Sequence, residues 1–262
     1  MNDPGAVIPS AAHAAQHLIA CKRLLVLAGA GLSADAGVPT FRGEGGLWKN
    51  HRVEDLATPE GFRRDPEQVW EWYRERRLQV ASCEPHPGQR ALALLQKHFA
   101  DATVLVATTN EDDLLDRAGV LQVVHLHGML FDTICDAGCG WGQRDGEDNS
   151  LSLAPCPRCG ALTRPGSVWF GEPLSAGVFE SVQAFDADGC IVVGSSCSVE
   201  PVSGIPAELA RARIPVVEIN PAETPFSSLA TVSLRSSARE ALPVLVDLLT
   251  SRTMREQRRR MT

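Results

Sequence analysis

Hydrophobic runs and amphipathic stretches alternate along most of the chain. Short runs rich in leucine and β-branched residues are typical of strands buried on both faces of a parallel sheet. Between them, the pattern predicts helices over 10–21, capped by Ser10, and over 65–80, opened by Asp65-Pro66. This alternation predicts βαβ units and a doubly wound, Rossmann-like parallel sheet of the α/β class. The predicted strands are residues 23–28, 103–108, 122–126, 190–193 and 216–219.

Two stretches interrupt the alternation. Residues 43–84 have the pattern of loops and helices, and residues 131–165 are glycine-rich and contain a cluster of cysteines. Because neither has the pattern of a sheet element, we interpret both as insertions that form a smaller second domain. The predicted division is a dinucleotide-binding domain of residues 1–43, 85–130 and 166–262, and a small helical and zinc-ribbon domain of residues 44–84 and 131–165.

Four of the eight cysteines form two pairs, Cys135-x3-Cys139 and Cys156-x2-Cys159, separated by 16 residues. This spacing approximates the paired knuckles that bring four thiolates around one Zn²⁺. Because four sulfur ligands fill the coordination sphere, we predict a structural and not a catalytic zinc. The cysteines predicted to be unligated are Cys21, Cys83, Cys190 and Cys197.

The bulk composition narrows the class of protein. The chain has 262 residues, 44% hydrophobic and 22% charged, as in ordinary globular proteins that bury a core without disulfides. No apolar run approaches the roughly 18 residues of a membrane span, and the N-terminus has no secretory signal pattern, so we expect a cytoplasmic protein. The formal net charge of −7 argues against general affinity for nucleic acid and is compatible with binding of basic peptide segments.

A glycine loop follows the first predicted strand. Residues Gly29 to Ala34 fit the dinucleotide fingerprint, in which glycines let the backbone approach a pyrophosphate; the same loop also occurs where it serves packing alone. A dehydrogenase would place a second strand and an acidic ribose ligand about 20 residues further on. Here a loop runs instead from Gly37 to Gly43 and on to Trp48, which disfavours hydride transfer.

Polar side chains follow the next two predicted strands. Asn110 and Asp112 lie at the carboxyl edge of the sheet, where they would hold a carboxamide or position a water; alternatively, one of them caps a helix over 112–117. His125 and His127 project to the same side of the following strand. We expect one to be structural and His127, at the strand's end, to act as a general base.

Taken together, these segments resemble the sirtuin family, in order and over nearly the whole chain. The similar motifs are GAGLSADAGVPTFRG, TTNEDDLLDRAG, HLHG, LTRPGSVWFGE, GSSCSVEP and VVEIN. The resemblance implies an NAD-dependent protein-lysine deacylase. The acyl oxygen would attack the nicotinamide ribose, nicotinamide would leave, and His127 would accept a ribose hydroxyl proton. The products would be nicotinamide, free lysine and O-acyl-ADP-ribose.

The resemblance also implies site residues. The implied catalytic residues are His127, Asn110 and Asp112. The implied NAD contacts are Gly29, Ala30, Gly31, Ser33, Thr40, Phe41, Arg42, Trp48, Thr109, Asn110, Glu111, Asp112, Gly194, Ser195, Ser196, Asn220, Pro221, Ala222 and Ala238. The peptide of an acyl-lysine protein would add as a strand between 168–172 and 198–202. The implied contacts to this substrate are Tyr73, Arg76, Val168, Phe170, Gly171, Glu172 and Val199.

Tyr73 and Arg76 resemble the Tyr-x-x-Arg pair of the bacterial desuccinylase-like branch, which removes acidic acyl groups. One helical turn separates them, so both can face one pocket and hold a succinyl or malonyl carboxylate. The alternative is an arginine-rich, solvated helix face. We expect desuccinylase or demalonylase activity together with deacetylase activity.

Several positions depart from the family pattern. Thr109 replaces a glutamine, Glu111 an isoleucine or valine, Leu115 a histidine and Ser167 a groove valine. Glu111 adds a negative charge beside the implied nicotinamide pocket. Two other functions stay open: an NAD glycohydrolase or ADP-ribosyltransferase, and a non-catalytic sensor of NAD or acyl-peptide.

Overall fold

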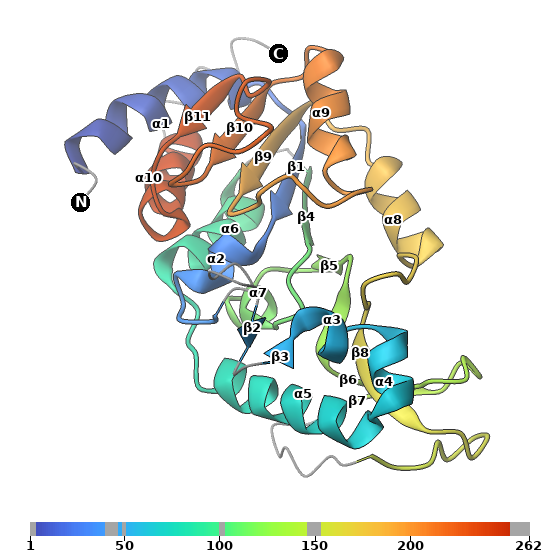
Figure 1. The fold of residues 1–262 in the computed structure, drawn as a ribbon. Coiled ribbons are helices and arrows are strands. Elements are labelled where there is room, and N and C mark those ends of the chain that lie inside the picture. Colours follow the sequence, from blue (N-terminus) through green and yellow to red (C-terminus); the bar gives the residue numbers. More distant parts are fainter. Residues whose placement is uncertain (1–3, 40–46, 49–50, 100–102, 146–152, 252–262) are drawn as a thin grey trace.

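The computed structural model describes residues 4–39, 47–48, 51–99, 103–145 and 153–251 of the chain. The side chains of residues 4–6, 47–48 and 51–54 lie outside that description. Among the described residues, no helix has both the length and the apolar character needed to cross a bilayer. Figure 1 shows a main sheet with helices on both faces, and a smaller unit beside the carboxyl ends of its central strands.

The main sheet is parallel and has six strands in the order β11-β10-β9-β1-β4-β5. The doubly wound sheet predicted from the hydrophobic runs is therefore confirmed. Three of its strands differ from the prediction. β9 begins one residue earlier than predicted, β5 is shorter, with Gln122 at a left-handed φ of 51°, and β11 was not predicted. The strands are β1 Arg23–Ala28, β4 Thr103–Thr108, β5 Val124–His125, β9 Gly189–Val193, β10 Val216–Ile219 and β11 Val232–Leu234.

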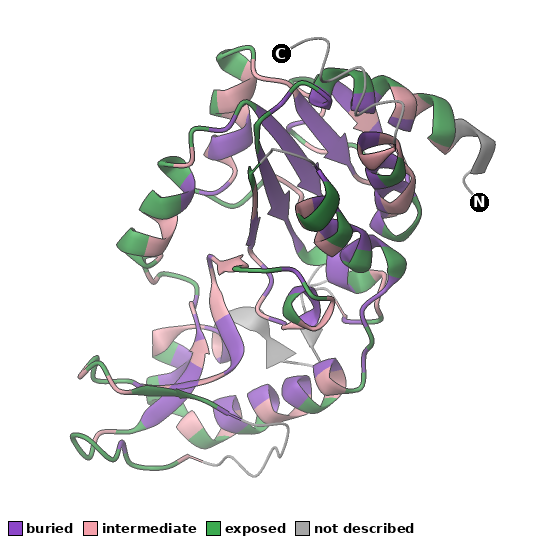
Figure 2. Cartoon of the chain, turned by 180° about the vertical axis from the view of Figure 1, so that it is seen from behind, coloured by how far each residue is buried: buried purple, intermediate pink, exposed green. Residues whose placement is uncertain are grey.

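Alternate residues of the sheet point into two separate cores. Leu24 and Val26 of β1 pack with α1, α6 and α10 on one face, while Leu25 and Leu27 pack with α8 and α9 on the other. Figure 2 shows these strands buried and the outer faces of the helices exposed. The helices of this part are α1 Pro4–Leu18, α2 Ala30–Ala34, α6 Pro87–His98, α7 Leu114–Arg117, α8 Ala176–Gln183, α9 Gly204–Arg211 and α10 Ala238–Thr250.

The bounds of three helices test the predictions made from capping patterns. α1 begins before Ser10, which lies inside the helix and is not its cap. α5 (Pro66–Ala81) begins as predicted, and the Asp65 side chain accepts from the Gln68 backbone N–H at 2.9 Å. α7 begins two residues later than the predicted 112.

The smaller unit contains a second, three-stranded sheet and a separate antiparallel pair, β2 (Leu47–Trp48) and β3 (His51–Arg52), so the expectation of no sheet elements in residues 131–165 and 43–84 was wrong. β6 (Gly128–Cys135) pairs antiparallel with β7 (Gly142–Arg144) and β8 (Thr163–Ser167). Partner strands this short, separated by the glycine-rich cysteine turns, give little hydrophobic alternation in the sequence. The other elements are β2 Leu47–Trp48, β3 His51–Arg52, α3 Val53–Leu56, α4 Pro59–Arg64 and α5.

Helix α5 is held to this second sheet by a buried cation. The Arg77 guanidinium lies 3.0 Å from the Asp145 carboxylate and donates to the Leu130 and Asp132 carbonyls at 2.7 and 2.8 Å. A buried arginine needs such complete pairing because an unpaired charge in the interior is costly. This pairing fixes the face of α5 that packs on the second sheet.

Candidate active site

A cavity of about 690 Å³ lies at the carboxyl ends of β1, β4 and β9 and extends to α5 and the end of β8. Ligands of open parallel sheets bind at this edge. The predicted site residues that line it are Gly29, Ala30, Gly31, Ser33, Tyr73, Arg76, Thr109, Asn110, Glu111, Asp112, His127, Val168, Phe170, Gly171, Glu172, Gly194, Ser195, Ser196, Val199, Asn220 and Ala222.

The remaining predicted residues divide into two groups. Pro221 and Ala238 are described but do not line the cavity, and Ala238 is buried at the start of α10. The others fall outside the described part of the chain: Thr40, Phe41 and Arg42 entirely, and Trp48 in its side chain.

Glycines let two loops approach at one wall of the cavity. The Gly31 N–H donates to the Gly194 carbonyl at 2.8 Å, and the Gly29 N–H donates to the Val193 carbonyl at 2.9 Å. Gly194 has a left-handed φ of 61°, and a Cβ atom there would lie 2.3 Å from the Leu32 nitrogen. Gly29 and Gly31 therefore allow the two loops to pack closely. Ala30 and Gly31, at the start of α2, also line the cavity.

The loop after β10 completes this end of the cavity. The Asn220 amide donates to the Ser195 carbonyl at 2.8 Å, and its oxygen accepts from the Ala222 N–H at 3.1 Å. Glu218, fully buried beneath the loop, accepts from Ser233 and Arg235 at 2.8 Å each. These bonds fix polar backbone and side-chain groups where the ribose and adenine ends of a dinucleotide are expected.

Asn110, Ser33 and Asp112 form a buried polar network at the end of β4. The Asn110 amide donates to the Ser33 hydroxyl at 2.8 Å and to the Gly29 carbonyl at 3.1 Å. Burial raises the pKa of Asp112, and a hydrogen bond from Ser33 opposes that shift. Asp112 also accepts from the Leu114 N–H at 3.2 Å at the start of α7, although the N-cap position of this helix is Asp113. The network ties the polar segment to the glycine loop.

The two histidines have different surroundings. The His125 ring lies 3.0 Å from the Asp116 carboxylate and 3.3 Å from the Asn110 carbonyl, so both of its nitrogens have partners. His127 lines the cavity, where burial lowers its pKa and the Thr109 backbone opposes the shift. A lowered pKa keeps the His127 imidazole neutral near pH 7, the form that accepts a proton.

The segment after β8 forms another wall of the cavity. The Val168 N–H donates to the His127 carbonyl at 2.8 Å, and the Phe170 N–H donates to the Ala57 carbonyl at 2.9 Å. Glu172 forms a bidentate ion pair with Arg164, with N–O distances of 2.8 and 2.9 Å, so its carboxylate stabilises this wall of the cavity. Phe170, 58% exposed, and Val199, 45% exposed, leave apolar surface at the mouth.

Tyr73 and Arg76 face the cavity from α5 and are both buried, so the alternative of a solvated helix face is wrong for them. The Arg76 guanidinium lies 5.1 Å from the centre of the Trp72 ring. The Tyr73 hydroxyl accepts from the Trp169 indole N–H at 2.8 Å. Burial raises the pKa of Tyr73, which keeps the phenol neutral and able to donate a hydrogen bond.

Trp169 is a cavity residue that was not predicted from the sequence. Its indole fills the floor of the cavity at 2% exposure and holds Tyr73. Trp169 could have been predicted as a site residue, because it belongs to the motif LTRPGSVWFGE with other predicted site residues. A tryptophan that is buried also needs an acceptor for its indole N–H.

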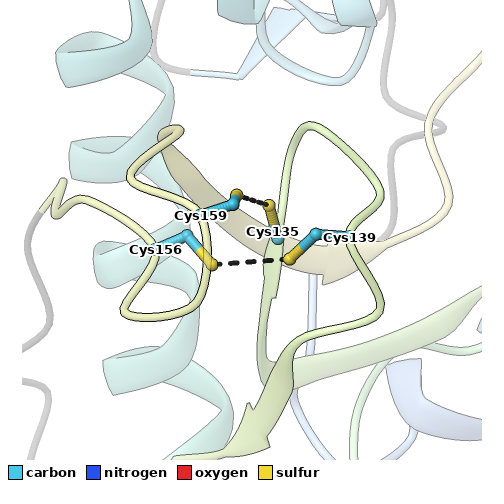
Figure 3. A group of neighbouring side chains, drawn as sticks. All are labelled: Cys135, Cys139, Cys156 and Cys159. Atoms are coloured by element: carbon cyan, nitrogen blue, oxygen red, sulfur yellow. Dashed lines mark hydrogen bonds between the residues drawn. The ribbon is translucent and has the colours of Figure 1, made fainter.

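The four clustered cysteines meet beside the second sheet (Figure 3), and none of them lines the cavity. The Cys135 and Cys159 sulfurs lie 3.4 Å apart, the Cys139 and Cys156 sulfurs 3.7 Å apart, and all four within 4.8 Å of one another. Tetrahedral thiolates around Zn²⁺ have sulfurs about 3.8 Å apart, so the residues fit this metal. The four would hold one zinc with no open position, which supports a structural role.

Comparisons with known proteins agree with this arrangement. The Sir2 family model matches residues 29–201, from the glycine loop past β9. An NAD-dependent protein deacylase of Mycobacterium tuberculosis is 46% identical over 236 residues, which cover 87% of this chain and 98% of that protein.

Solved structures give the same result. A Sir2 homologue in complex with NAD is 38% identical, covers 93% of each chain and superposes with a TM-score of 0.83. A mutated Sir2 homologue in complex with 2'-O-acetyl-ADP-ribose is 37% identical, with a TM-score of 0.83 over 93% of this chain and 96% of that one. On the family model, the close relative and these structures, the chain belongs to the Sir2 family.

Proposed function

We propose that this chain is an NAD-dependent protein deacylase that acts on acylated lysine side chains. One observation carries the proposal: a neutral, cavity-facing His127 lies at the same sheet edge as the network of Ser33, Asn110 and Asp112. The similar deacylase and the homologue structures with NAD and 2'-O-acetyl-ADP-ribose support this chemistry.

Each part of the cavity has a task in this reaction. When bound, NAD supplies a ribose carbon from which nicotinamide can leave. The Asn110 amide and the Asp112 carboxylate, both 7% exposed, orient the nicotinamide end and exclude bulk water from it. His127 removes a proton from a ribose hydroxyl, which makes that oxygen nucleophilic toward the acyl carbon. The backbone of 168–172 and 198–202 holds the substrate peptide in an extended form.

Acidic acyl groups are the substrate class that we assign to the pocket. Tyr73 and Arg76 offer a neutral hydroxyl and a cation at its α5 end, a combination that binds a carboxylate by a charge-assisted hydrogen bond. A zinc ion on the four cysteines would hold the second sheet in place and take no part in the reaction.

Product analysis tests the proposal. The protein is incubated with NAD and either acetyl-lysine or succinyl-lysine peptide, and the products are identified by mass spectrometry. We expect nicotinamide, deacylated peptide and O-acyl-ADP-ribose in equal amounts. Consumption of NAD at a rate that the peptide does not change would indicate a glycohydrolase instead. Peptide binding without any NAD consumption would indicate a sensor.

A further inference from the structure

Glu111 is a carboxylate inside the cavity that the proposed reaction does not use. It follows Asn110 in the loop after β4, and its backbone carbonyl accepts from the Leu130 N–H at 2.7 Å. Its side chain lines the cavity, and its Oε2 atom is buried without a hydrogen-bond partner among the residues that the structure describes. A buried oxygen with no partner is costly, and it points to a group that completes the site only with ligand bound.

The groups around Glu111 are those assigned to the acyl chain. The Arg76 charge attracts the Glu111 carboxylate, and the Glu111 charge in turn acts on Tyr73. Ser167 at the end of β8 is fully buried, and its hydroxyl oxygen, like Glu111 Oε2, has no hydrogen-bond partner among the described residues. Carboxylate, guanidinium and phenol therefore share one end of the cavity.

This arrangement sets a conflict of charges for an acidic substrate. A succinyl or malonyl group would bring a second carboxylate to a pocket whose described lining has one guanidinium, that of Arg76. Ionisation of two carboxylates in one site is costly, because their negative charges repel each other. In other proteins such a pair therefore holds a shared proton. A neutral acyl group such as acetyl meets no such conflict.

We propose that Glu111 determines the acyl specificity of this enzyme by competing with the carboxylate of an acidic acyl group for Arg76. The inference rests on the proposed deacylase function. With Glu111 ionised, its negative charge offsets the positive charge of Arg76, and the pocket favours uncharged acyl groups. With Glu111 protonated, its carboxylic acid donates a hydrogen bond to the substrate carboxylate while Arg76 supplies the charge. The preference for acidic acyl groups therefore falls as pH rises.

The direction of this pH dependence follows from the groups facing Glu111. Burial raises its pKa, and Arg76 from α5 and Ser167 from β8 oppose that shift. Asp112, its neighbour in the same loop, raises the pKa further, while Tyr73 from α5 stays neutral. The raised pKa brings protonation of Glu111 toward the neutral range, where assays of the enzyme are possible.

The test uses Glu111→Gln, which keeps the shape and removes the charge. Asp113→Asn is the matched control, because it neutralises a carboxylate two residues further along the same loop, which faces Arg117 and does not line the cavity. The kcat/KM values for succinyl- and acetyl-lysine peptides are measured between about pH 6 and pH 9. We expect Glu111→Gln to raise the succinyl-to-acetyl ratio by about tenfold or more, mainly through KM, and to flatten its pH dependence. Asp113→Asn should leave the ratio as in the wild type.

Several results separate this inference from the proposed function. If Glu111→Gln still deacylates the acetyl peptide but leaves the ratio and its pH profile unchanged, Glu111 does not set specificity. If no variant turns over any peptide, the deacylase function fails, and fluorescence anisotropy with the same two peptides then decides the role of Glu111. If the ratio of succinyl-peptide to acetyl-peptide affinity is the same in the wild type and in Glu111→Gln, the role of Glu111 in specificity is overturned. A gain of about tenfold in affinity for the succinyl peptide in Glu111→Gln would support that role.

Discussion

The two ends of the cavity are built in different ways. At the dinucleotide end, backbone groups pack against each other, as where the Gly31 N–H meets the Gly194 carbonyl at 2.8 Å. At the acyl end, side chains meet, and the charges of Arg76 and Glu111 act on one another and on Tyr73. Backbone packing between loops tolerates almost no substitution, whereas side chains can change one at a time. We infer that the fold fixes the NAD chemistry and that individual residues set the acyl group.

The largest expected effect comes from breaking the backbone packing. In Gly194→Val the new Cβ would lie 2.3 Å from the Leu32 nitrogen, and valine would need a left-handed φ of 61°. We expect a loss of about 3 kcal/mol or more in the free energy of unfolding, together with loss of NAD binding. Chemical denaturation and calorimetric NAD titration measure the two effects.

A glycine in open surroundings supplies the control. Gly177 lies in α8, and a Cβ atom there meets no other atom within 4 Å. Gly177→Ala should keep NAD binding and stabilise the helix by up to about 1 kcal/mol. Normal NAD binding in Gly194→Val would contradict the view that the loop contact fixes this end of the site.

A smaller effect, confined to the reaction, is expected from His127→Ala. We expect kcat/KM for both acyl peptides to fall by about 10²- to 10⁴-fold, with little change in stability. Because burial lowers the His127 pKa, the wild type should keep its activity down to a pH below the usual pKa of histidine. The activity should be lost at the lower pH at which the ring becomes protonated. A pH profile of kcat/KM measures this. Activity lost already above the usual histidine pKa would argue against His127 as the base.

The same contrast explains what the sequence could predict. The runs at β1, β4 and β10 were predictable to the residue, because strands buried on both faces leave continuous hydrophobic sequence. β11, with three residues, and the short strands around the cysteine turns carry too little pattern. The fingerprint glycines were also readable, since their local spacing matches a backbone requirement.

The acyl end was harder to predict for a physical reason. Arg76 lies on α5, Glu111 in the loop after β4 and Ser167 at the end of β8, and only the tertiary fold brings them together. From the sequence, Glu111 was a departure beside the implied nicotinamide pocket, and only the structure shows that the charge of Arg76 acts on its carboxylate. Local patterns carry no information on such a meeting of distant charges.

Removing the positive charge of Arg76 tests the acyl end of the cavity. Arg76→Met keeps much of the buried volume of the side chain and removes its charge. We expect kcat/KM for the succinyl peptide to fall by about 10- to 100-fold and that for the acetyl peptide to change little. Arg74→Met is the control, because Arg74 pairs with Glu71 on the same helix outside the cavity. An equal loss for both peptides would mean that Arg76 supports the fold and does not select the acyl group.

The smallest expected effect concerns the hydrogen bond that orients Tyr73. Trp169→Phe keeps an aromatic ring near the Arg164 guanidinium, now 3.9 Å from the indole, but removes the N–H that donates to the Tyr73 hydroxyl at 2.8 Å. Trp70→Phe removes a comparable buried bond, to the Thr163 carbonyl at 2.9 Å, outside the cavity. Each variant should lose about 1 kcal/mol of stability. Only Trp169→Phe should raise KM for the succinyl peptide relative to the acetyl peptide, by about three- to fivefold, because a phenol free to rotate binds a carboxylate less well. If Trp70→Phe shifted the ratio equally, the acyl preference would follow from overall stability, and the separation between a fixed NAD end and a residue-by-residue acyl end would fail.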